Sequence, residues 1–590
     1  MCGIVGYIGF EDCKPILLNG LKKLEYRGYD SSGIAVINDG IKIFKESGRV
    51  ASMEATVSDE ESNVGIAHTR WATHGVPNKL NAHPHLSKDG RFVIVHNGVI
   101  ENYVFLKKTY FPNHEFVSDT DTEVLVDLIE LFYNESNSMQ KAIQKMITIV
   151  KGSFALVIMD QETDELYGVK NKSPLLIGIG EGFNMFGSDV SCMLEKTNEF
   201  YEFHDKEYAI LTKDDIKIFD SLGNKITRES YISSINLSDT ELGVYPHYML
   251  KEIEEQSSVI RRILSKYYSD YTISEELLKN MRDTDRINIV AAGTSFYAGM
   301  VAKSIFESVI KKPVDVHIAS EFVYNTPLLT EKPFFIFISQ SGETADSRAA
   351  LLKVNNMGYK ALTMTNVEGS TLSRESDYTL LLFAGPEIAV CSTKAYTAQI
   401  AVCSILASKI NEDYVIDMRS ELSLTASVID DIVSIKHKVE KFAHDYLLTT
   451  RNCFYKGRGL DYYVALEAAL KLKEIRYIQT EGFAAGELKH GTIALIEEGI
   501  PVIAIISQAH TALNTRGNIR EVQARGANTL TISFESISEE TDELILPDVH
   551  PLLTPLVTII PAQYLSYYAA LERNLDIDKP RNLAKSVTVE

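Results

Sequence analysis

The chain has 590 residues, which exceeds the size of a single hydrophobic core and favours about three or four domains. Its formal net charge is −21, from 59 basic and 80 acidic residues, and a surface of this sign repels nucleic-acid phosphates and anionic lipid headgroups. We therefore expect no nucleic-acid partner and no membrane association, whereas a local site for a small anionic substrate is compatible with the charge.

Targeting and redox features favour a cytoplasmic protein. No apolar run approaches the ~20 residues that cross a bilayer, and the N-terminus lacks a basic stretch followed by a long apolar one. The cysteines are scattered without a CxxC pair, which favours reduced thiols over a disulfide framework or a zinc ribbon. They are Cys2, Cys13, Cys192, Cys391, Cys403 and Cys453.

The N-terminal part of the chain is predicted to be rich in short buried strands. Near-continuous apolar runs bounded by Gly or Asn indicate strands in a layered fold. They cover residues 3–8, 33–37, 92–96, 153–159, 165–169 and 174–177, with helices at 14–25 and 122–133. The sequence turns polar and irregular over residues 233–244, and a helical pattern follows at 248–267. We place a domain boundary at this polar stretch.

The remainder contains an internal repeat. Residues 287–295 and 453–459 are each an apolar strand that ends in a Gly-containing turn before a helix. Next in each copy comes a strand that ends in Ile-Ser-Gln, over residues 335–344 and 503–511. Matching strand–turn–helix units in the same order predict a duplicated α/β domain with parallel sheets.

Cys2 follows Met1 directly, so removal of Met1 would leave a thiol and a free α-amine on one residue. The amine has an intrinsic pKa near ~8 and can act as a base for the nucleophilic sulfur. By itself this dipeptide carries little weight, because cysteine is usually a small core residue.

A dense set of polar segments accompanies Cys2. Asn97 next to Gly98 can supply a side-chain and a backbone donor to an oxyanion. Arg70 offers a fork for a carboxylate and Asp121 a counter-charge for an ammonium, so together they suit an amino acid. The segments cover residues 68–75, 81–85, 96–102 and 118–123.

The segments MCGIVGYIG, LEYRGYDSSG, HTRWATHG, NAHPH, HNGVIEN and TDTE resemble the class II glutamine amidotransferase domain. The resemblance implies an N-terminal-nucleophile fold with four layers in the order α/β/β/α. It also implies that Cys2 is the nucleophile, that its α-amine is the base, and that Asn97 and Gly98 form the oxyanion hole. The glutamine-binding residues it implies are Arg70, Thr73, His74, Gly98 and Asp121, with Arg27 and Trp71 near the entrance and the ammonia path.

A metal site is the alternative for the histidine-rich part of this region. Its histidines are His68, His74, His83, His85 and His96. No pair is spaced i, i+4 on a predicted helix and no acidic ligand is suitably placed, so we expect no metal.

In the second half, SQSGET (residues 339–344) lies between an apolar strand and a helix. Hydroxyls, a glycine and free N–H groups at a helix N-terminus suit a phosphate, although an ordinary helix cap has the same composition. The second copy, SQAHTA (residues 507–512), loses Ser and Gly at the matching positions. We therefore expect one functional and one degenerate anion site.

A predicted helix over residues 461–478 places Glu467, Lys471 and Glu474 on one stripe. From periodicity alone, a solvent-exposed row of ion pairs is the ordinary interpretation. The Gly-rich segment at 481–491 contains His490, which could transfer protons near neutral pH.

The segments AAGTS, ISQSGETADS, EIAVCSTKA, ALKLKEI, EGFAAGELKHG and PRNLAKSVTVE resemble the paired sugar isomerase (SIS) domains of isomerising aminotransferases, over residues 245–590. The resemblance implies two doubly wound parallel α/β domains and a catalytic C-terminal tail. It implies that Lys585 forms a Schiff base with the sugar, that Glu474 moves a proton between C1 and C2 with Lys471 in support, and that His490 of the partner subunit opens the ring. Ser339, Gln340, Ser341 and Thr344 would bind the phosphate, and Thr294, Ser295, Val390 and Ser392 would surround the sugar.

The expected domains are residues 2–238, 245–430 and 437–575, with a tail at 576–590. The resemblances imply a cofactor-independent homodimer that transfers the amide nitrogen of glutamine to fructose 6-phosphate through a closed ammonia route, giving glucosamine 6-phosphate for hexosamine synthesis. A related enzyme for another ketose phosphate and a non-catalytic sugar-phosphate sensor remain as alternatives. Departures from the family pattern are Ala292, Cys391 and Thr492.

Overall fold

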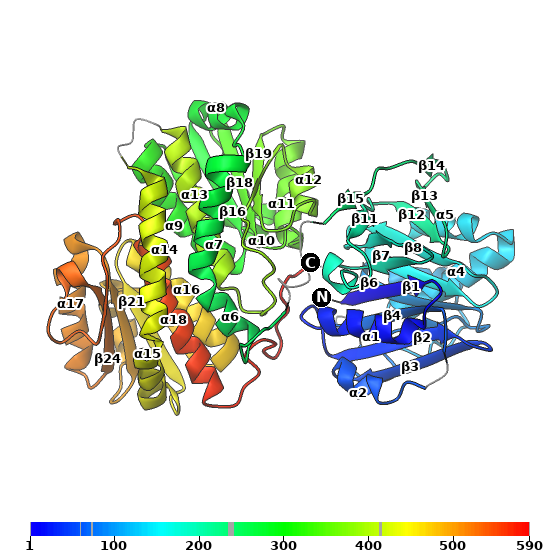
Figure 1. Ribbon diagram of the computed structural model, residues 1–590, viewed down its shortest axis with the longest axis horizontal. Coiled ribbons are helices and arrows are strands. Elements are labelled where there is room, and N and C mark those ends of the chain that lie inside the picture. Colours follow the sequence, from blue (N-terminus) through cyan, green and yellow to red (C-terminus); the bar gives the residue numbers. More distant parts are fainter. Residues whose placement is uncertain (1, 59–60, 72–74, 234–240, 412–415, 589–590) are drawn as a thin grey trace. The chain divides into compact units, whose positions relative to one another are not determined.

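The structure is a computed structural model that describes residues 2–58, 61–71, 75–233, 241–411 and 416–588. The chain forms two compact units, one of Met1–Glu241 with Ala584–Glu590 and one of Leu242–Leu583 (Figure 1). The finer division at residues 430–437 and the separate tail from residue 576 stay predictions. None of the described helices is long and apolar enough to cross a membrane.

The N-terminal unit contains two antiparallel sheets. The first, in spatial order, is β15 (Tyr231–Ile232), β11 (Glu199–Tyr201), β9 (Leu176–Ile179), β10 (Asn184–Gly187), β1 (Gly3–Ile8), β4 (Val64–Arg70), β2 (Ser31–Ile37) and β3 (Ile41–Ser47). The second is β14 (Lys225–Ile226), β13 (Ile216–Phe219), β12 (Glu207–Leu211), β8 (Leu166–Asn171), β7 (Gly152–Asp160), β6 (Phe92–Ile100) and β5 (His85–Leu86).

The two sheets pack face to face between helices. Side chains of β1, β4, β6 and β7 fill the space between the sheets, and on β1 Ile4 points there while Val5 points to the outer face. The helices are α1 (Cys13–Leu24) and α2 (Val50–Glu54) on the first sheet, with α3 (Tyr103–Tyr110), α4 (Thr122–Ser136) and α5 (Met139–Ile149) on the second. The predicted α/β/β/α order is confirmed, and burial of both faces explains the near-continuous apolar strands.

The strand predicted at residues 3–8 is β1, and the other predicted strands lie within a few residues of those observed. The helix predicted at 248–267 is two helices, α6 (Tyr248–Glu254) and α7 (Gln256–Ser265). At the junction the Gln256 amide donates to the Ile253 carbonyl at 3.0 Å and to Gln563 Oε1 at 2.7 Å. This side chain competes with the backbone ladder, which periodicity does not reveal.

The second unit contains two parallel five-stranded sheets with the same topology. The first is β17 (Val314–Ile318), β16 (Arg286–Ala291), β18 (Pro333–Ser339), β19 (Ala361–Thr365) and β20 (Tyr378–Leu381). The other is β22 (Gln479–Ala484), β21 (Asn452–Gly457), β23 (Pro501–Ile506), β24 (Asn528–Phe534) and β25 (Leu544–Leu546). In both, the chain reverses direction across the sheet after its second strand, so the predicted duplication and doubly wound class are confirmed.

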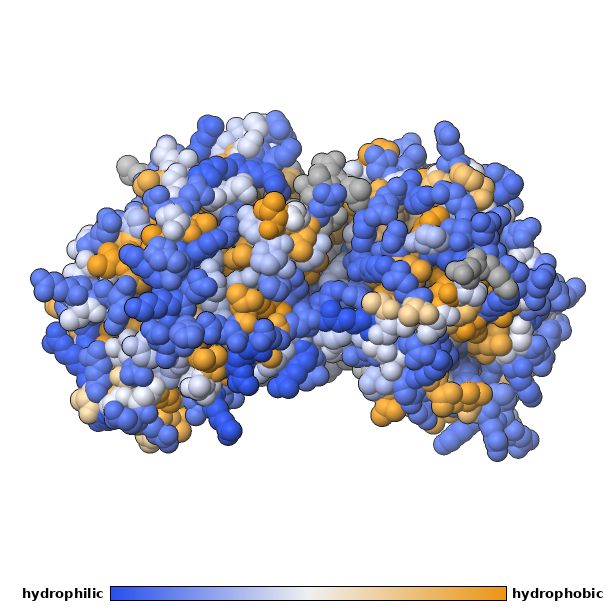
Figure 2. Space-filling view, turned by 60° about the horizontal axis from the view of Figure 1, so that its bottom comes forward, coloured by the Kyte–Doolittle hydropathy of each residue, from blue (hydrophilic) through white to orange (hydrophobic). Residues whose placement is uncertain are grey.

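One large core joins the two repeats. It is built from the inner faces of both sheets with α6, α7, α8 (Glu275–Asp283), α9 (Gly293–Ile310), α13 (Lys394–Ile410), α14 (Met418–Ser434), α15 (Lys436–Phe442), α16 (Leu460–Arg476) and α18 (Thr554–Leu571). The opposite faces are covered by α10 (Ala319–Tyr324), α11 (Ala345–Asn356) and α12 (Thr371–Glu375) in the first repeat and by α17 (Ala509–Gln523) in the second. Outside this core the surface is mainly hydrophilic with small scattered hydrophobic areas (Figure 2).

The loop after β23, which matches the anion loop of the first repeat, is filled by a carboxylate of the chain itself. Asp461 accepts hydrogen bonds from the Ser507 hydroxyl and, at 2.9 Å, from the Ser507 backbone N–H. Asp461 is 1% exposed, and burial raises its pKa to about 7. A carboxyl group of the chain already occupies this loop, which is a physical reason to expect no phosphate there.

Asp461→Asn is expected to stabilise the protein increasingly as pH rises. A carboxyl whose pKa is about 7 when folded and 3.8 when unfolded costs stability progressively between those two values, and the amide removes this cost. The amide oxygen can still accept the Ser507 N–H, while the amide nitrogen donates to the Ser507 hydroxyl oxygen in a reversed contact. We expect the melting temperature of the variant, relative to wild type, to rise by about 2–4 °C from pH 5 to pH 8. Asp431→Asn, at an exposed position of α14, is the control. A melting-temperature difference between variant and wild type that does not change with pH would contradict the raised pKa of Asp461.

Candidate active sites

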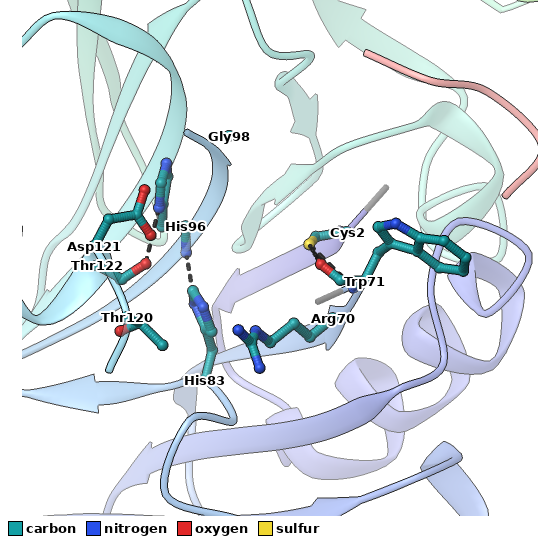
Figure 3. A pocket seen from close by; sticks show the side chains of 9 residues that line it. All are labelled: Cys2, Arg70, Trp71, His83, His96, Gly98, Thr120, Asp121 and Thr122. Atoms are coloured by element: carbon teal, nitrogen blue, oxygen red, sulfur yellow. Dashed lines mark hydrogen bonds between the residues drawn. The ribbon is translucent and has the colours of Figure 1, made fainter. Parts of the chain in front are cut away.

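A small cavity in the N-terminal unit gathers most of the polar residues that the sequence singles out. Figure 3 shows Cys2, Arg70 and Trp71, at the ends of strands of one sheet, on one side of the cavity. His83, His96 and Asp121 lie on the other side of the cavity. The full lining is Cys2, Arg70, Trp71, His83, His96, Gly98, Thr120, Asp121 and Thr122. Thr73 and His74, also predicted for this site, lie outside the described residues.

Cys2 lies immediately before β1, and its sulfur is held by the backbone of Trp71. The Trp71 N–H donates to Sγ at 3.3 Å, and the thiol donates to the Trp71 carbonyl at 3.6 Å. Burial raises the thiol pKa, with nearby positive charges such as Arg70 acting in the opposite direction. The thiol therefore needs a base to become a nucleophile. A Cβ on Gly3 would come within 2.7 Å of Leu24 Cβ, so glycine is required where β1 starts against α1.

Asn97 and Gly98 lie on β6. Asn97 Nδ2 donates to the Cys2 carbonyl at 3.1 Å and to Ser188 Oγ at 2.9 Å, so the amide lies beside Cys2. Gly98 has φ of 140°, and a Cβ there would lie 1.9 Å from the Ser153 carbonyl oxygen. Only glycine can therefore present its N–H with this backbone geometry.

Ser188 is a functional candidate that the sequence analysis missed. Besides accepting from Asn97, its hydroxyl accepts the Ile4 N–H at 2.9 Å and so ties β1 to β6. The next residue, Asp189, forms an ion pair with Arg27 at 2.9 Å. Arg27 is buried and is not part of the cavity lining, so it holds the Ser188 turn in place. A Gly-Ser-Asp sequence directly after a strand, β10, was the available signal.

Arg70 and Asp121, the pair predicted to hold an amino acid, both reach the cavity (Figure 3). Arg70 is the last residue of β4 and donates to the Gly75 carbonyl at 3.3 Å. Asp121 precedes α4, and its Oδ2 accepts the Ile100 N–H at 2.8 Å. Trp71 lines the cavity and meets Tyr29 edge to face at 6.2 Å.

The histidines of this region stack on one another. The rings of His68 and His83 lie 4.1 Å apart and 12° from parallel. Burial lowers the pKa of His68 to about 3 and those of His83 and His85 well below the usual range, so these rings are neutral. Within the described residues, the three possible metal ligands that lie together are elsewhere: His114, Glu123 and Asp127. There His114 Nε2 pairs with Asp127 at 3.1 Å.

In the second unit, the predicted phosphate loop follows β18. Ser339 Oγ accepts the Gly342 N–H at 3.0 Å and bonds with Thr344 Oγ1 at 2.9 Å, while Ser341 Oγ accepts the Glu343 N–H at 3.2 Å. A Cβ on Gly342 would lie 2.0 Å from Ser370 Oγ, so glycine is required in this turn. The loop opens α11, whose first N–H groups favour an anion.

This loop lies where ligands bind in doubly wound sheets. β16 and β18 are parallel neighbours with Ala291 beside Ile338, so the segments that follow them meet at the same edge. The chain turns one way from β16 to β17 and the other way to β18 and β19, which makes this edge the topological switch point. Thr294 lies in the first turn of α9 after β16, Ser339 is the last residue of β18, and Gln340 follows it.

The row on α16 is buried, so its interpretation as a solvent-exposed row is wrong. The side chains of Glu467 and Lys471 are 0% exposed and that of Glu474 is 20% exposed. Lys471 Nζ lies 3.2 Å from Glu467 Oε1 and 2.8 Å from Glu474 Oε2. Burial raises the pKa of Glu467 to about 7, whereas the neighbouring negative groups hold the pKa of Lys471 well above its usual range despite burial. Periodicity misled here because packing by α9, α13 and α18 is non-local.

The residues predicted around the sugar converge on this row. Lys471 Nζ donates to Thr294 Oγ1 at 2.9 Å and to the Ser392 carbonyl at 3.1 Å. Ser295 Oγ accepts from Gln399 at 2.9 Å, and the Val390 N–H donates to the Asp578 carbonyl at 2.9 Å. These contacts bring Thr294, Ser392 and Glu474 together.

His490 and Lys585 are the other two residues predicted to act on the sugar. His490 is exposed, and its backbone N–H donates to the Glu487 carbonyl at 2.9 Å. Lys585 belongs to the tail segment that groups with the N-terminal unit. The catalytic roles of both residues stay predictions.

Comparisons with known proteins cover the whole chain. A glutamine amidotransferase domain model matches residues 68–195, and a SIS domain model matches residues 280–409 and 446–573. The glutamine–fructose-6-phosphate aminotransferase [isomerizing] of Geobacillus kaustophilus is 56% identical over 600 residues, with 100% of each chain covered. The enzyme of the same name from Staphylococcus aureus is 56% identical over 601 residues, again with 100% of each covered.

Solved structures match the second unit. The C-terminal domain of glucosamine-fructose-6-phosphate aminotransferase from Francisella tularensis is 35% identical, with a TM-score of 0.54, 58% of this chain and 99% of that chain covered. Tagatose-6-phosphate ketose/aldose isomerase of Escherichia coli, at 19% identity and a TM-score of 0.50, covers 57% of this chain and 96% of its own and shares the fold alone. With full-length identity of 56% to its curated relatives, the chain belongs to the isomerizing glutamine–fructose-6-phosphate aminotransferase family.

Proposed function

We propose that the chain transfers the amide nitrogen of L-glutamine to D-fructose 6-phosphate and isomerises the product, giving D-glucosamine 6-phosphate and L-glutamate. This reaction opens hexosamine synthesis toward UDP-N-acetylglucosamine. Its main support is the full-length identity to enzymes of that name, together with a thiol cavity and a switch-point anion loop in one chain.

In the glutaminase half, Cys2 attacks the side-chain amide carbon of glutamine and ammonia leaves. Water then hydrolyses the thioester to glutamate. Because burial raises the thiol pKa, the reaction needs a base, and the α-amine exposed on Cys2 by loss of Met1 supplies it. Asn97 Nδ2 and the Gly98 N–H stabilise the oxyanion, and Arg70 and Asp121 bind the carboxylate and ammonium ends, joined by Thr73 and His74.

In the sugar half, the loop of Ser339, Gln340, Ser341 and Thr344 binds the phosphate. The Lys585 amine condenses with the C2 carbonyl and releases water, and ammonia then displaces the lysine. Glu474 takes a proton from C1 and returns it to C2, which converts the ketose skeleton to the aldose. Lys471 Nζ lies 2.8 Å from Glu474 Oε2, so the ammonium pairs with this carboxylate and holds it in place.

Three further assignments belong to this proposal. The chain acts as a homodimer in which His490 of each subunit opens the sugar ring in its neighbour, and the exposure of His490 in the single chain supports this arrangement. Ammonia passes through a closed route near Trp71, since ammonium formed in bulk water is not a nucleophile. The enzyme works in the cytoplasm.

The proposed reaction is tested by proton NMR of the purified protein with glutamine and fructose 6-phosphate. We expect glucosamine 6-phosphate and glutamate in near-equal amounts. Lys585→Ala should abolish amino-sugar formation while leaving glutamine hydrolysis measurable, because the Schiff base is needed for only one half-reaction. Lys579→Ala, in the same tail, is the matched control. Glutamate without an amino sugar in wild type would contradict the acceptor, and intact synthesis in Lys585→Ala would contradict the Schiff base.

Gly98→Ala is expected to lower glutamine hydrolysis by about 10²–10³-fold, the usual cost of losing one oxyanion donor. The added Cβ would lie 1.9 Å from the Ser153 carbonyl, so the N–H must turn away from the cavity. Glutaminase activity measured by glutamate release checks this. Gly90→Ala, at a φ of 80° with open space around it, is the control for backbone strain alone. Equal losses in both variants would rule out the donor role.

A further inference from the structure

Cys391 contacts the acid–base carboxylate of the proposed sugar site. Its Sγ donates to Glu474 Oε2 at 3.0 Å, and Lys471 Nζ lies 2.8 Å from the same oxygen. The residue is 0% exposed and lies in the segment before α13, far from Glu474 in sequence.

We propose that Cys391 is a positioning residue for Glu474, which fixes the carboxylate through an S–H···O hydrogen bond and directs its second oxygen toward C1 and C2 of the sugar phosphate. This inference rests on the proposed transferase reaction. With two donors on Oε2, Oε1 is the oxygen presented for proton transfer.

The chemistry of the thiol suits a donor and not a nucleophile. Burial and the neighbouring Glu474 charge raise the Cys391 pKa well above its usual range, so the sulfur keeps its proton at neutral pH. A protonated thiol can donate to a carboxylate, and a hydrogen bond to an ionised group is stronger than one between neutral groups.

The segment that carries Cys391 is held rigidly by buried carboxylates. Glu387 Oε1 accepts the Thr393 and Ala395 N–H groups at 2.9 and 3.0 Å. Glu252 Oε1 accepts the Ala389 N–H at 3.1 Å. A donor on such a segment restricts the carboxylate it binds, because the segment itself cannot follow the carboxylate.

The same segment also binds the row through its backbone. The Ser392 carbonyl accepts from Lys471 at 3.1 Å, so two adjacent residues contact neighbouring charges of α16. Titratable groups facing Glu474 are Lys471 and Glu467 from α16, Cys391, and Tyr297 from α9. Among these, Cys391 and Lys471 are the donors to Oε2.

The test measures amino-sugar synthesis from glutamine and fructose 6-phosphate by Cys391→Ala, Cys391→Ser and wild type across pH. For Cys391→Ala we expect kcat to fall about tenfold, as for loss of a hydrogen bond to a charged group, with the KM for fructose 6-phosphate nearly unchanged. Loss of a donor disfavours an ionised carboxylate, so the acidic limb of the pH–rate profile should move to higher pH. Cys391→Ser retains an O–H donor, so most of the wild-type kcat and the wild-type position of the acidic limb should be restored.

Cys403→Ala is the matched control, since Cys403 is also 0% exposed but contacts Met364 Sδ at 3.5 Å instead of the charged row. Glutamine hydrolysis should be unaffected in all variants. The inference would be overturned if Cys391→Ala kept the wild-type kcat and the wild-type acidic limb of the pH–rate profile. It would also be overturned if Cys403→Ala showed the same shift of that limb. Absence of amino sugar from wild type would instead refute the proposed function, so the two failures are distinguishable.

Discussion

The buried ammonium of Lys471 is the constraint on which the sugar site depends. An uncompensated charge of this kind inside a protein costs several kcal/mol, and removing one partner of a buried pair typically costs about 3–5 kcal/mol. Here the charge is balanced by Glu467 and Glu474 and by acceptors on Thr294 and Ser392. The helix α16, the start of α9 and the segment before α13 must therefore keep their relative positions, and these three elements surround the proposed substrate.

The two repeats differ in what contacts the matching loop after their central strand. In the first, hydroxyls of the loop after β18 bond with one another and with the loop backbone. In the second, Asp461 from the start of α16 fills the equivalent loop. The same helix thus anchors the degenerate loop with its first turn and supplies the charged row further along. The contacts of Asp461 with this loop therefore help to hold α16, and with it the charged row, in place.

The sequence predicted those features that local patterns encode. The strand β1, the repeated parallel sheets and the anion loop after β18 each follow from a short apolar run with its bounding residues, and each is confirmed as a structural element. The burial of Glu467 and Lys471 was missed because their i, i+4 spacing is the same for a surface helix. Ser188 was missed because its partners, Ile4 and Asn97, are distant in sequence. The burial of Glu467 and Lys471 and the contacts of Ser188 depend on tertiary packing, which local sequence patterns do not encode.

In the N-terminal site, as in the sugar site, burial and contacts between distant residues determine the charges and positions of the side chains. His68, His83 and His85 are neutral because burial lowers their pKa values, and the cavity holds Arg70 and Asp121, which suit the two ends of an amino acid. Asn97 is oriented by Ser188 and the Cys2 carbonyl, and the Ser188 turn is held in turn by Arg27 through Asp189. A residue expected at the entrance therefore acts from the interior. One series of contacts therefore links Arg27 through Asp189, Ser188 and Asn97 to Cys2, so a change at Arg27 would reach Cys2 indirectly.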